Sequence, residues 1–481
     1  MRRTYDVAVA APSQSGERAR RGRPRLLADL SPLRNRVFRS LWIGWSVSAF
    51  GNQLTTVAVA YETYTLTHST LMVGLVGLVQ LVPSLVGSLW GGSLVDAKDR
   101  RALLIGIQFV LAATSAGFFL NARLGHPALW AIYGCVVLSA GVQAVNFPAR
   151  SAIMSQTVDR DDLPAASALL GISNQFALIA GPAIAGILIA TVGVAAAFAI
   201  DTATFGAVVI AALALPRLPP VDGGAPMGVR SVVEGLQYAR RNRFLVSLLI
   251  IDFSSMVFGM PRAVFPALAV HLYHGGPGIL GVLYAATGFG AFVASLCSGW
   301  VRHVHFRGRA VVACMVVWGV AITIMGVIPV AAVGVAMLAV AGAADMIGGV
   351  FRNTIWQTTV PTRFQGRLAG VFYGSAVGAN SVGDGEAGVA AAIGGPLFAL
   401  WSGGVLSLLG VVAVLWRFPE LWRSTGRDLV DFDEDDEDAA TIDGRSSDPD
   451  LPGGDAQPRA RQPSPRHRLR ARRTVDEATR R

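Results

Sequence analysis

Acidic side chains inside long apolar runs are the residues of this sequence best suited to chemistry. Asp384 and Glu386 lie in one such run, and Asp345 lies seven residues before Arg352 in another. A spacing of seven places two side chains on the same face of a helix. A carboxyl group in a membrane helix is costly unless it pairs or holds a proton, so Asp345, Asp384 and Glu386 are candidate proton carriers.

Arg262 and Arg352 are the expected cationic partners of these carboxyl groups, because both also lie within apolar runs. Asp252 cannot pair directly with Arg262, since ten residues of continuous helix would separate them by about 15 Å. Asp252 and Glu62 are expected closer to the membrane surfaces. For each buried residue, a structural ion pair between helices remains an alternative to a role in proton exchange.

The composition indicates a protein that lies mostly in lipid. Of its 481 residues, 52% are hydrophobic and 15% are charged, whereas a soluble domain has roughly 25% charged residues. The net charge of +10 does not indicate nucleic-acid binding, because the basic residues cluster between apolar runs. Cys135, Cys297 and Cys314 lie in apolar runs and predict neither a disulfide framework nor a metal site. No cofactor is expected.

Apolar runs of about twenty residues, each long enough to cross a bilayer as a helix, recur along the chain. They predict an all-α membrane protein with about twelve transmembrane helices. The runs are 38–66, 71–95, 102–120, 128–147, 163–189, 194–213, 244–270, 278–301, 310–330, 333–355, 368–393 and 397–416.

The distribution of basic residues between the loops predicts the orientation. Loops on one side carry clusters such as Arg100-Arg101 and Arg240-Arg241, whereas the opposite loops hold Arg123 and little else basic. Because basic loops stay on the cytoplasmic side, both termini are expected in the cytoplasm.

The polar segment 216–243, which contains several prolines and glycines, divides the apolar runs into two halves. We expect six-helix bundles at 38–215 and 244–417, with disordered tails at 1–37 and 418–481. The halves also resemble each other. Gly74 corresponds to Gly281 and Gly92 to Gly299, each pair about 207 residues apart, as parallel-repeat transporters would show.

The loop after the second run carries the most specific motif of the chain. Its sequence resembles the loop signature of the major facilitator superfamily, with departures at Ala97 and Asp99, where the family commonly has Arg and Gly. The matching residues are Gly92, Leu94, Asp96, Arg100 and Arg101.

Three further stretches resemble the bacterial enterobactin-exporter-like branch of these permeases. They are residues 146–150, 180–186 and 365–370. The resemblance covers about residues 33–416 and implies two bundles that rock about a central cavity. It also implies a multi-pass protein of the bacterial inner membrane.

The resemblance implies that Asp96 braces a gate on the cytoplasmic side. Physically, the start of the eleventh run near Gly366 and Arg367 offers free N–H groups and the positive end of a helix dipole. Arg150 could share the charge of Asp96, and the flanking Gly92, Arg100 and Arg101 complete the loop. A simple loop cap at Asp96 remains the alternative.

Gly181 and Pro182 in the fifth run are similar to an antiporter signature of the major facilitator superfamily. Gly186 also matches this signature, whereas Ala185 stands where the family has a glycine. Proline frees a backbone carbonyl, and small residues allow close helix packing. A helix bend that favours export by exchange is therefore expected, with an ordinary packing kink as the alternative.

The expected cavity wall is apolar with scattered aromatic and hydroxyl groups, and it suits an amphipathic solute. Its expected residues include Trp45, Asn52, Gln53, Tyr61, Gln80, Tyr284, Trp356 and Tyr373. We expect a monomeric secondary transporter, not an enzyme, that exports a siderophore or drug-like molecule in exchange for protons. A facilitator or importer and a non-transporting membrane sensor remain alternatives. No nucleotide-binding loop is present, and the outer loops are too short for an enzyme's catalytic cluster.

Overall fold

The computed structural model describes residues 29–219, 237, 240, 242–360 and 362–423. Side chains are described within these ranges except at Leu89, Ser93, Asp96, Arg302, 362–373 and Arg423. The described segments are helices and their connections, and none of them is a strand. The expected all-α fold is therefore confirmed for this part of the chain.

The first six long helices contain the first six apolar runs almost completely, and the fourth helix extends ten residues beyond its run. They are α1 (Arg36–Thr67), α2 (Thr70–Ala97), α3 (Arg100–Ala122), α4 (Leu129–Thr157), α5 (Leu163–Thr191) and α6 (Val194–Leu213).

The second half repeats this pattern with one interruption. Its long helices are α8 (Arg243–Gly259), α10 (Gly276–Leu296), α11 (Arg307–Val327), α12 (Ala331–Thr359), α13 (Thr362–Gly394) and α14 (Pro396–Arg417). Short elements are η1 (Ser31–Arg34), η2 (Arg160–Asp162), η3 (Arg262–Val264), α9 (Phe265–Ala267), η4 (Leu268–Leu272), η5 (Ser298–His303) and α15 (Glu420–Arg423).

Ten helical segments in the described residues are long and apolar enough to cross a membrane. The two other long helices, α1 and α13, have 32 and 33 residues but carry more polar side chains. The expected count of twelve spans is consistent with this set.

The expected run 244–270 is not one helix. It breaks after Gly259, because Pro261 has no N–H to continue the hydrogen-bond ladder. The chain resumes through η3 and α9 to the π-helix η4. Arg262 is the first residue after this break, so our expectation of a continuous helix between Asp252 and Arg262 is wrong.

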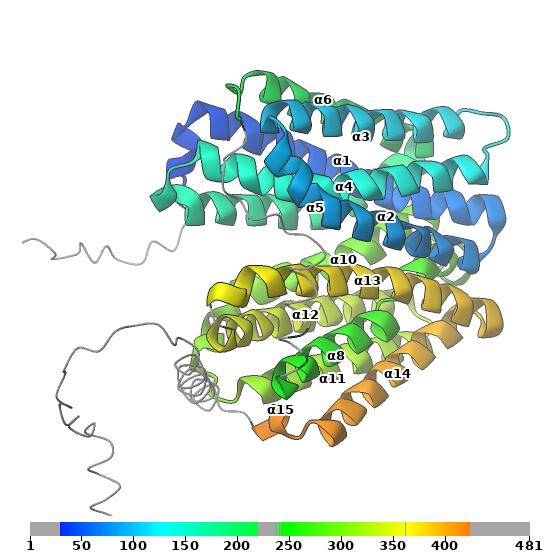
Figure 1. Ribbon diagram of the computed structural model, residues 1–481. Coiled ribbons are helices and arrows are strands. Elements are labelled where there is room, and N and C mark those ends of the chain that lie inside the picture. Colours follow the sequence, from blue (N-terminus) through cyan, green and yellow to red (C-terminus); the bar gives the residue numbers. More distant parts are fainter. Residues whose placement is uncertain (1–28, 220–236, 238–239, 241, 361, 424–481) are drawn as a thin grey trace, which may run out of the picture. The chain divides into compact units, whose positions relative to one another are not determined.

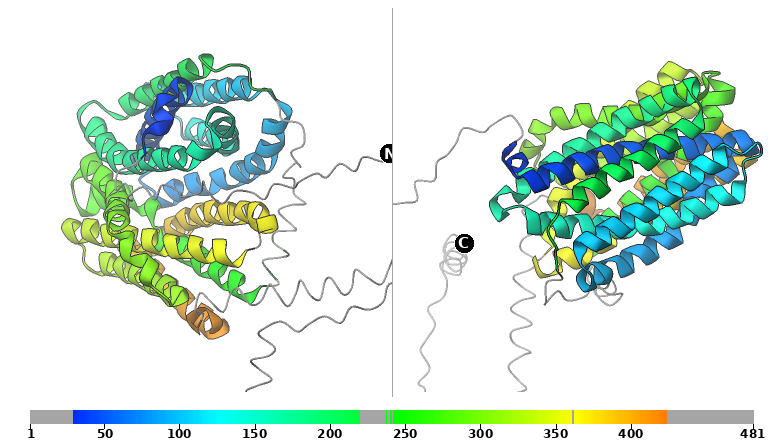
Figure 2. Two further views of the ribbon diagram at one scale, coloured as in Figure 1. Left: turned by 90° about the vertical axis from the view of Figure 1, so that its left-hand side faces the viewer. Right: turned by 90° about the horizontal axis from the view of Figure 1, so that it is seen from above.

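Helix contacts form two groups (Figures 1 and 2). Helices α1 to α6 contact one another, as do α8 and α10 to α14, and the groups meet chiefly where α2 packs on α13 and α5 on α10. We call the end where α1 begins the terminal end, at the left of Figure 1. The far end is where α1 joins α2 and α3 joins α4. The segment that would join the groups lies largely outside the described residues.

Near the far end, glycines allow the two groups to approach each other closely. A Cβ atom on Gly186 of α5 would lie 3.0 Å from the Cα of Gly281 in α10. One on Gly388 of α13 would lie 3.1 Å from the Cα of Gly74 in α2. Both crossings therefore bring backbone against backbone, which only a residue without a side chain allows.

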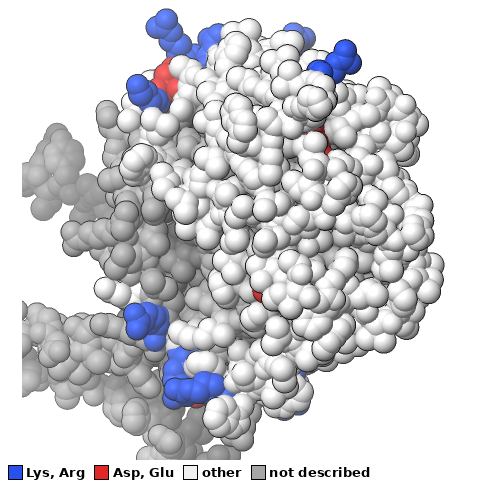
Figure 3. All heavy atoms as spheres, turned by 90° about the vertical axis from the view of Figure 1, so that its right-hand side faces the viewer, with Lys and Arg blue, Asp and Glu red and all other residues white. Residues whose placement is uncertain are grey.

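The face at the far end is almost free of charge. In the space-filling view of Figure 3, Lys and Arg gather only at the margins, and little Asp or Glu is visible between them.

Candidate functional site: a cavity between the two helix groups

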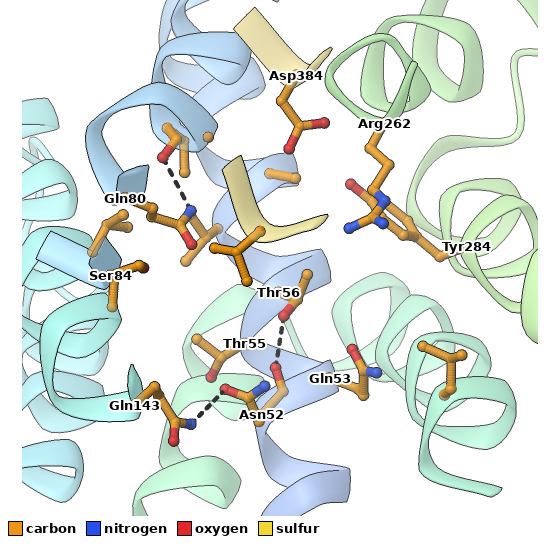
Figure 4. A pocket seen from close by; sticks show the side chains of 18 of the residues that line it. Asn52, Gln53, Thr55, Thr56, Gln80, Ser84, Gln143, Arg262, Tyr284 and Asp384 are labelled. Atoms are coloured by element: carbon orange, nitrogen blue, oxygen red, sulfur yellow. Dashed lines mark hydrogen bonds between the residues drawn. The ribbon is translucent and has the colours of Figure 1, made fainter. Parts of the chain in front are cut away.

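A cavity of about 740 Å³ lies between the two groups and receives side chains from both. This size falls within the range of small-molecule sites. In the first group its wall is rich in amide and hydroxyl groups (Figure 4). They belong to Asn52, Gln53, Thr55, Thr56, Gln80, Ser84, Gln143 and Asn146.

These polar side chains orient one another. The Nδ2 of Asn146 donates to the Oε1 of Gln143 at 2.9 Å, and the Nε2 of Gln143 donates to the Oδ1 of Asn52 at 3.4 Å. Of the aromatic residues expected in the wall, Tyr284 does line the cavity. Trp45 is instead buried beneath Arg150, whose guanidinium carbon lies 4.9 Å from the ring centre. The remaining wall is mostly apolar, as expected.

The second group contributes opposite charges to the same cavity. Arg262, placed by the break after Gly259, donates to the Oδ1 of Asn380 at 3.3 Å and lines the cavity with Asp384. Figure 4 shows the Arg262 guanidinium beside Tyr284, with Asp384 on the neighbouring helix. The Oδ1 of Asp384 is buried and has no hydrogen-bond partner among the described residues.

Asp384 also lies at the contact between the groups. A Cβ atom on Gly77 of α2 would lie 2.9 Å from the Oδ2 of Asp384, and one on Gly74 would meet its main-chain oxygen. The carboxyl group on α13 therefore touches both the cavity and the opposite helix group.

Glu386 is separated from this site. Two residues along a helix point to nearly opposite faces, and Glu386 is not among the described residues that line the cavity. The sequence proposed Asp384 and Glu386 as equal candidates, and only Asp384 reaches the cavity.

Asp345 and Arg352 meet on α12, as their spacing of seven predicts, and Asp252 of α8 joins them. The Nη2 of Arg352 lies 3.0 Å from the Oδ1 of Asp345, and its Nη1 lies 3.0 Å from the Oδ1 of Asp252. The side chains of Arg352 and Asp252 are 7% and 8% exposed, whereas that of Asp345, which lines the cavity, is 44% exposed. Asp252 is therefore buried and paired with Arg352.

Arg100 and Arg101, which the sequence placed in the loop after the second run, are the first residues of α3 and bind carbonyl groups of neighbouring helices. Arg100 is buried and donates from Nη1 to the main-chain oxygen of Ala152 at 3.3 Å. Arg101 donates to the oxygen of Leu213, the last residue of α6, at 2.9 Å. A cation there is favourable, because helix C-termini carry unpaired carbonyl groups and negative dipole charge.

Of the residues expected at the gate, Asp96 is the second-last residue of α2, Gly366 and Arg367 lie in α13, and the side chains of Asp96 and Arg367 are outside the described part of the chain. Gly92 lies within α2, and Arg150 lines the cavity. The helix α13 begins at Thr362, earlier than expected. Its free N–H groups therefore belong to 362–365 and not to Gly366 and Arg367.

The Gly181-Pro182 region serves close packing within one continuous helix, α5. A Cβ atom on Gly181 would lie 2.6 Å from the Cβ of Gln53 in α1, and one on Gly186 would lie 2.6 Å from the oxygen of Pro277. The oxygen of Pro182 faces Gly281. This region thus joins α5 to both α1 and the opposite helix group.

Two buried carboxyl groups, Glu62 and Asp201, were not among the site residues that the sequence predicted. Glu62 lies near the far end of α1, is 5% exposed, and its Oε2 has no hydrogen-bond partner among the described residues. Asp201 of α6 is 2% exposed and accepts hydrogen bonds from Thr55 of α1 and Ser115 of α3. An acidic residue in an apolar run was the available signal, but its partners come from helices distant in sequence.

The cavity extends toward the terminal end and is closed toward the far end. A second hollow of about 340 Å³ shares Asn52, Gln143 and Arg150 with it and continues to Ser48 and Gly171. These two residues lie nearer the terminal ends of α1 and α5 than the cavity does. Toward the far end, the glycine crossings press the two groups together.

Comparisons with known proteins agree with this architecture. The family described as "Transmembrane secretion effector" matches residues 27–436. The enterobactin exporter EntS of Citrobacter koseri is 27% identical over 358 residues, which cover 74% of this chain and 86% of that protein. The enterobactin exporter EntS of Shigella flexneri is 27% identical over 391 residues, covering 81% and 94%.

Solved structures show the same fold at low identity. The nucleoside transporter NupG has a TM-score of 0.62 at 13% identity, covering 80% of this chain and all of that chain (100%). A bacterial homolog of the human lysosomal transporter Spinster, solved in an inward-facing and unoccupied conformation, has a TM-score of 0.58 at 14% identity, covering 83% and 98%. The chain therefore belongs to the transmembrane secretion effector family of the major facilitator superfamily, and it is a multi-pass membrane transporter of the enterobactin-exporter-like branch.

Proposed function

We propose that this transporter exports an amphipathic small molecule of the siderophore class in exchange for protons. The observation that carries the proposal is Asp384, a buried carboxyl group with an unpartnered oxygen at the point where the cavity meets both helix groups. A protonated Asp384 is neutral and can remain in this apolar contact, whereas an ionised one favours contact with water or a cation. Gain and loss of a proton at this position therefore bias how the two groups pack.

Arg262 links the proton to the solute. It shares the cavity with Asp384 and is held by Asn380. When Asp384 releases its proton, the carboxylate and the solute compete for the same guanidinium, so proton binding and solute binding exclude each other. Such competition is what an exchanger requires.

The solute class follows from the wall and from the relatives. Amide and hydroxyl groups line the first group's side, and the cavity also holds Arg150, Arg262 and the carboxyl groups of Asp201, Asp345 and Asp384. The amide, hydroxyl and guanidinium groups can donate hydrogen bonds to a solute with several oxygen atoms, as a siderophore has. The curated relatives are named as enterobactin exporters.

The transport cycle is alternating access in a bacterial inner membrane, with both termini cytoplasmic and one chain forming the whole pathway. On that orientation, the present conformation is open to the cytoplasm, ready to receive the solute. The gate that closes this side in the other state would be formed by Asp96, Arg150 and the start of α13, and the loop arginines Arg100 and Arg101 would anchor it.

Proton-linked efflux from vesicles tests the proposal. In proteoliposomes that contain the full chain and enterobactin as the probe, an imposed pH gradient is expected to drive probe movement. Asp384→Asn should lower this movement by about tenfold or more, because an amide cannot carry the proton. Exchange of labelled for unlabelled probe without a gradient should persist, since that step needs no proton transfer.

Asp161→Asn is the matched control, because Asp161 is an exposed carboxylate in η2, outside the cavity. Full gradient-driven movement in Asp384→Asn would refute proton carriage by Asp384. Equal movement with and without a gradient in the unmodified chain would indicate a facilitator.

A further inference from the structure

A second carboxyl group, Asp201, occupies a hydrogen-bonded niche in the first helix group. The Thr55 hydroxyl donates to its Oδ2 at 2.7 Å, and the Ser115 oxygen lies 2.9 Å from the same atom. The Thr204 hydroxyl lies 3.4 Å from the other oxygen, Oδ1. Asp201, Thr55 and Ser115 all line the cavity, so the niche connects with the transport pathway.

Among the described residues, Asp201 forms no ion pair. The ion pairs there join Arg243 to Glu420, and Arg352 to Asp252 and Asp345. Helix α6 packs on α1, α3 and α5. The described part of α5 has no ionisable side chain. The charged residues of α1 and α3 are Arg36, Arg39, Glu62, Arg100 and Arg101. Arg100 and Arg101 bind main-chain oxygens near the terminal end, and Glu62 would repel a carboxylate. A permanent negative charge here would be costly.

The hydrogen bonds of the niche can accommodate both protonation states. The Ser115 oxygen lies 2.9 Å from the Oδ2 of Asp201 and 3.1 Å from the main-chain oxygen of Phe198. One hydroxyl proton serves only one of these acceptors. An ionised Asp201 accepts from Ser115, and a protonated Asp201 donates to Ser115, which then donates to Phe198.

Phe198 does not depend on this bond, because the Thr202 hydroxyl donates to the same oxygen at 2.8 Å. Reversal of the Ser115 hydroxyl therefore leaves the oxygens of Ser115 and Phe198 and the Oδ2 of Asp201 paired in both states. A niche with this property can take up a proton and release it without rearrangement of the helices.

The distances favour a proton over a metal ion. Separations of 2.7 and 2.9 Å between hydroxyl and carboxylate oxygens are those of direct hydrogen bonds. Oxygen atoms that surround a cation such as sodium stand further apart, because the ion lies between them.

We propose that Asp201, with Thr55 and Ser115, forms a second proton-binding site, in the helix group opposite to Asp384. Its role in coupling rests on the proposed proton exchange, whereas proton binding itself does not. One proton-binding site then lies in each helix group.

Infrared difference spectroscopy of the full-length protein in lipid tests proton binding directly, with no solute present. A protonated carboxyl group gives a carbonyl-stretch band that disappears when the group ionises. One such band should disappear reversibly as the pH is raised across the range in which the transporter works. Asp201→Asn should remove it, and Ser115→Ala and Thr55→Val should shift it, because each changes a hydrogen bond to Asp201.

Asp384→Asn and the control Asp161→Asn should leave this band unchanged. If Asp201→Asn does not fold, the two hydroxyl variants still test the assignment, because a band from Asp201 must move in both. A band that persists at every pH, or that never appears, would overturn the site. A change on replacing choline with sodium would show a sodium site instead. The flux of Asp384→Asn in vesicles tests the proposed proton exchange, and the infrared band tests proton binding at Asp201. Either proposal can therefore fail while the other holds.

Discussion

At the residue scale, Arg352 shows how charges are tolerated inside this helix bundle. Its two terminal nitrogens each lie 3.0 Å from a carboxylate, one from Asp252 on α8 and one from Asp345 on its own helix. Asp252 is buried, so most of its stabilisation comes from Arg352. Asp345 is half exposed to the cavity and can be solvated by water there. Only the Asp345 end of this cluster is therefore available to a solute or a proton.

Removal of Arg352 should destabilise the protein strongly. Arg352→Met leaves Asp252 as a buried carboxylate without a partner, which costs about 3–5 kcal/mol. Asp252→Asn in the same chain should recover most of this loss, since the uncompensated charge is then gone. The measurement is thermal unfolding of the purified variants in detergent.

Arg243 provides the matched control for that measurement. Its ion pair with Glu420 spans 3.8 Å, and the two side chains are 58% and 52% exposed, so Arg243→Met should cost less than about 1 kcal/mol. Equal losses for Arg352→Met and Arg243→Met would mean that the buried pairing does not stabilise the fold.

At the element scale, the two crossings between the helix groups are built alike. Gly74 of α2 meets Gly388 of α13, and Gly281 of α10 meets Gly186 of α5. Gly74 and Gly281 are the residues that the internal repeat places in correspondence. The repeat is therefore expressed in the tertiary structure as two equivalent glycine contacts. Such contacts have no interlocking side chains, so they can close and open without repacking.

Gly186→Ala should oppose closure of the far end. The added methyl group would lie 2.6 Å from the oxygen of Pro277, and an overlap of this kind costs about 1–3 kcal/mol. The population with the far end open should rise by about tenfold, because each 1.4 kcal/mol is a factor of ten. This population can be measured as the rate at which an impermeant maleimide, added from the far-end side, labels Ser84→Cys in the cavity. The chain used has Cys135, Cys297 and Cys314 replaced by serine.

Gly171 of the same helix is the control, since a Cβ atom there would have nothing within 4 Å. Gly171→Ala should leave the labelling rate unchanged. Equal rates in the two variants would show that the contact at Gly186 does not hold the far end closed.

At the scale of the whole molecule, the conformation is asymmetric. The far end is closed by backbone contacts, whereas the cavity extends toward the terminal end through the hollow that reaches Ser48. Alternating access requires the opposite state, in which the terminal end is closed and the far end opens. The loop after α2 lies at the terminal end, where that closure would form.

Asp96→Asn should weaken closure of the terminal end. Loss of its negative charge removes attraction to the start of α13 and to Arg150, so the state described here should gain population. Gradient-driven efflux of enterobactin should fall severalfold, while labelling of Ser48→Cys from the terminal side should increase in the serine-substituted chain.

Asp99→Asn is the control from the same loop. Asp99 caps α3 through a hydrogen bond from Ala102 to its Oδ1 at 3.0 Å, and asparagine caps helices equally well. Undiminished efflux in Asp96→Asn would show that Asp96 acts only in the loop.

The sequence by itself determined the helices and their order. Runs of apolar residues long enough to cross a membrane predicted the position of each long helix, because the bilayer dictates both the length and the hydrogen bonding of a span. The ends were less certain: α4 extends ten residues beyond its run to Thr157, and α8 ends at Gly259, well before the end of its run. Spacing within one helix was equally informative, as the pairing of Asp345 with Arg352 shows. The family signature in the loop after α2 indicated a transporter, and the family match confirms it.

Tertiary structure alone decided which charges meet across helices. Asp252 joins Arg352, Asp201 meets Thr55 and Ser115, and Asp384 rather than Glu386 reaches the cavity. Local sequence sets the face on which a side chain lies, but the neighbour on that face depends on packing between distant segments. The break before Pro261 is a further example. The helix α8 ends at Gly259, and Arg262, at the start of the next element, lies in the wall of the cavity.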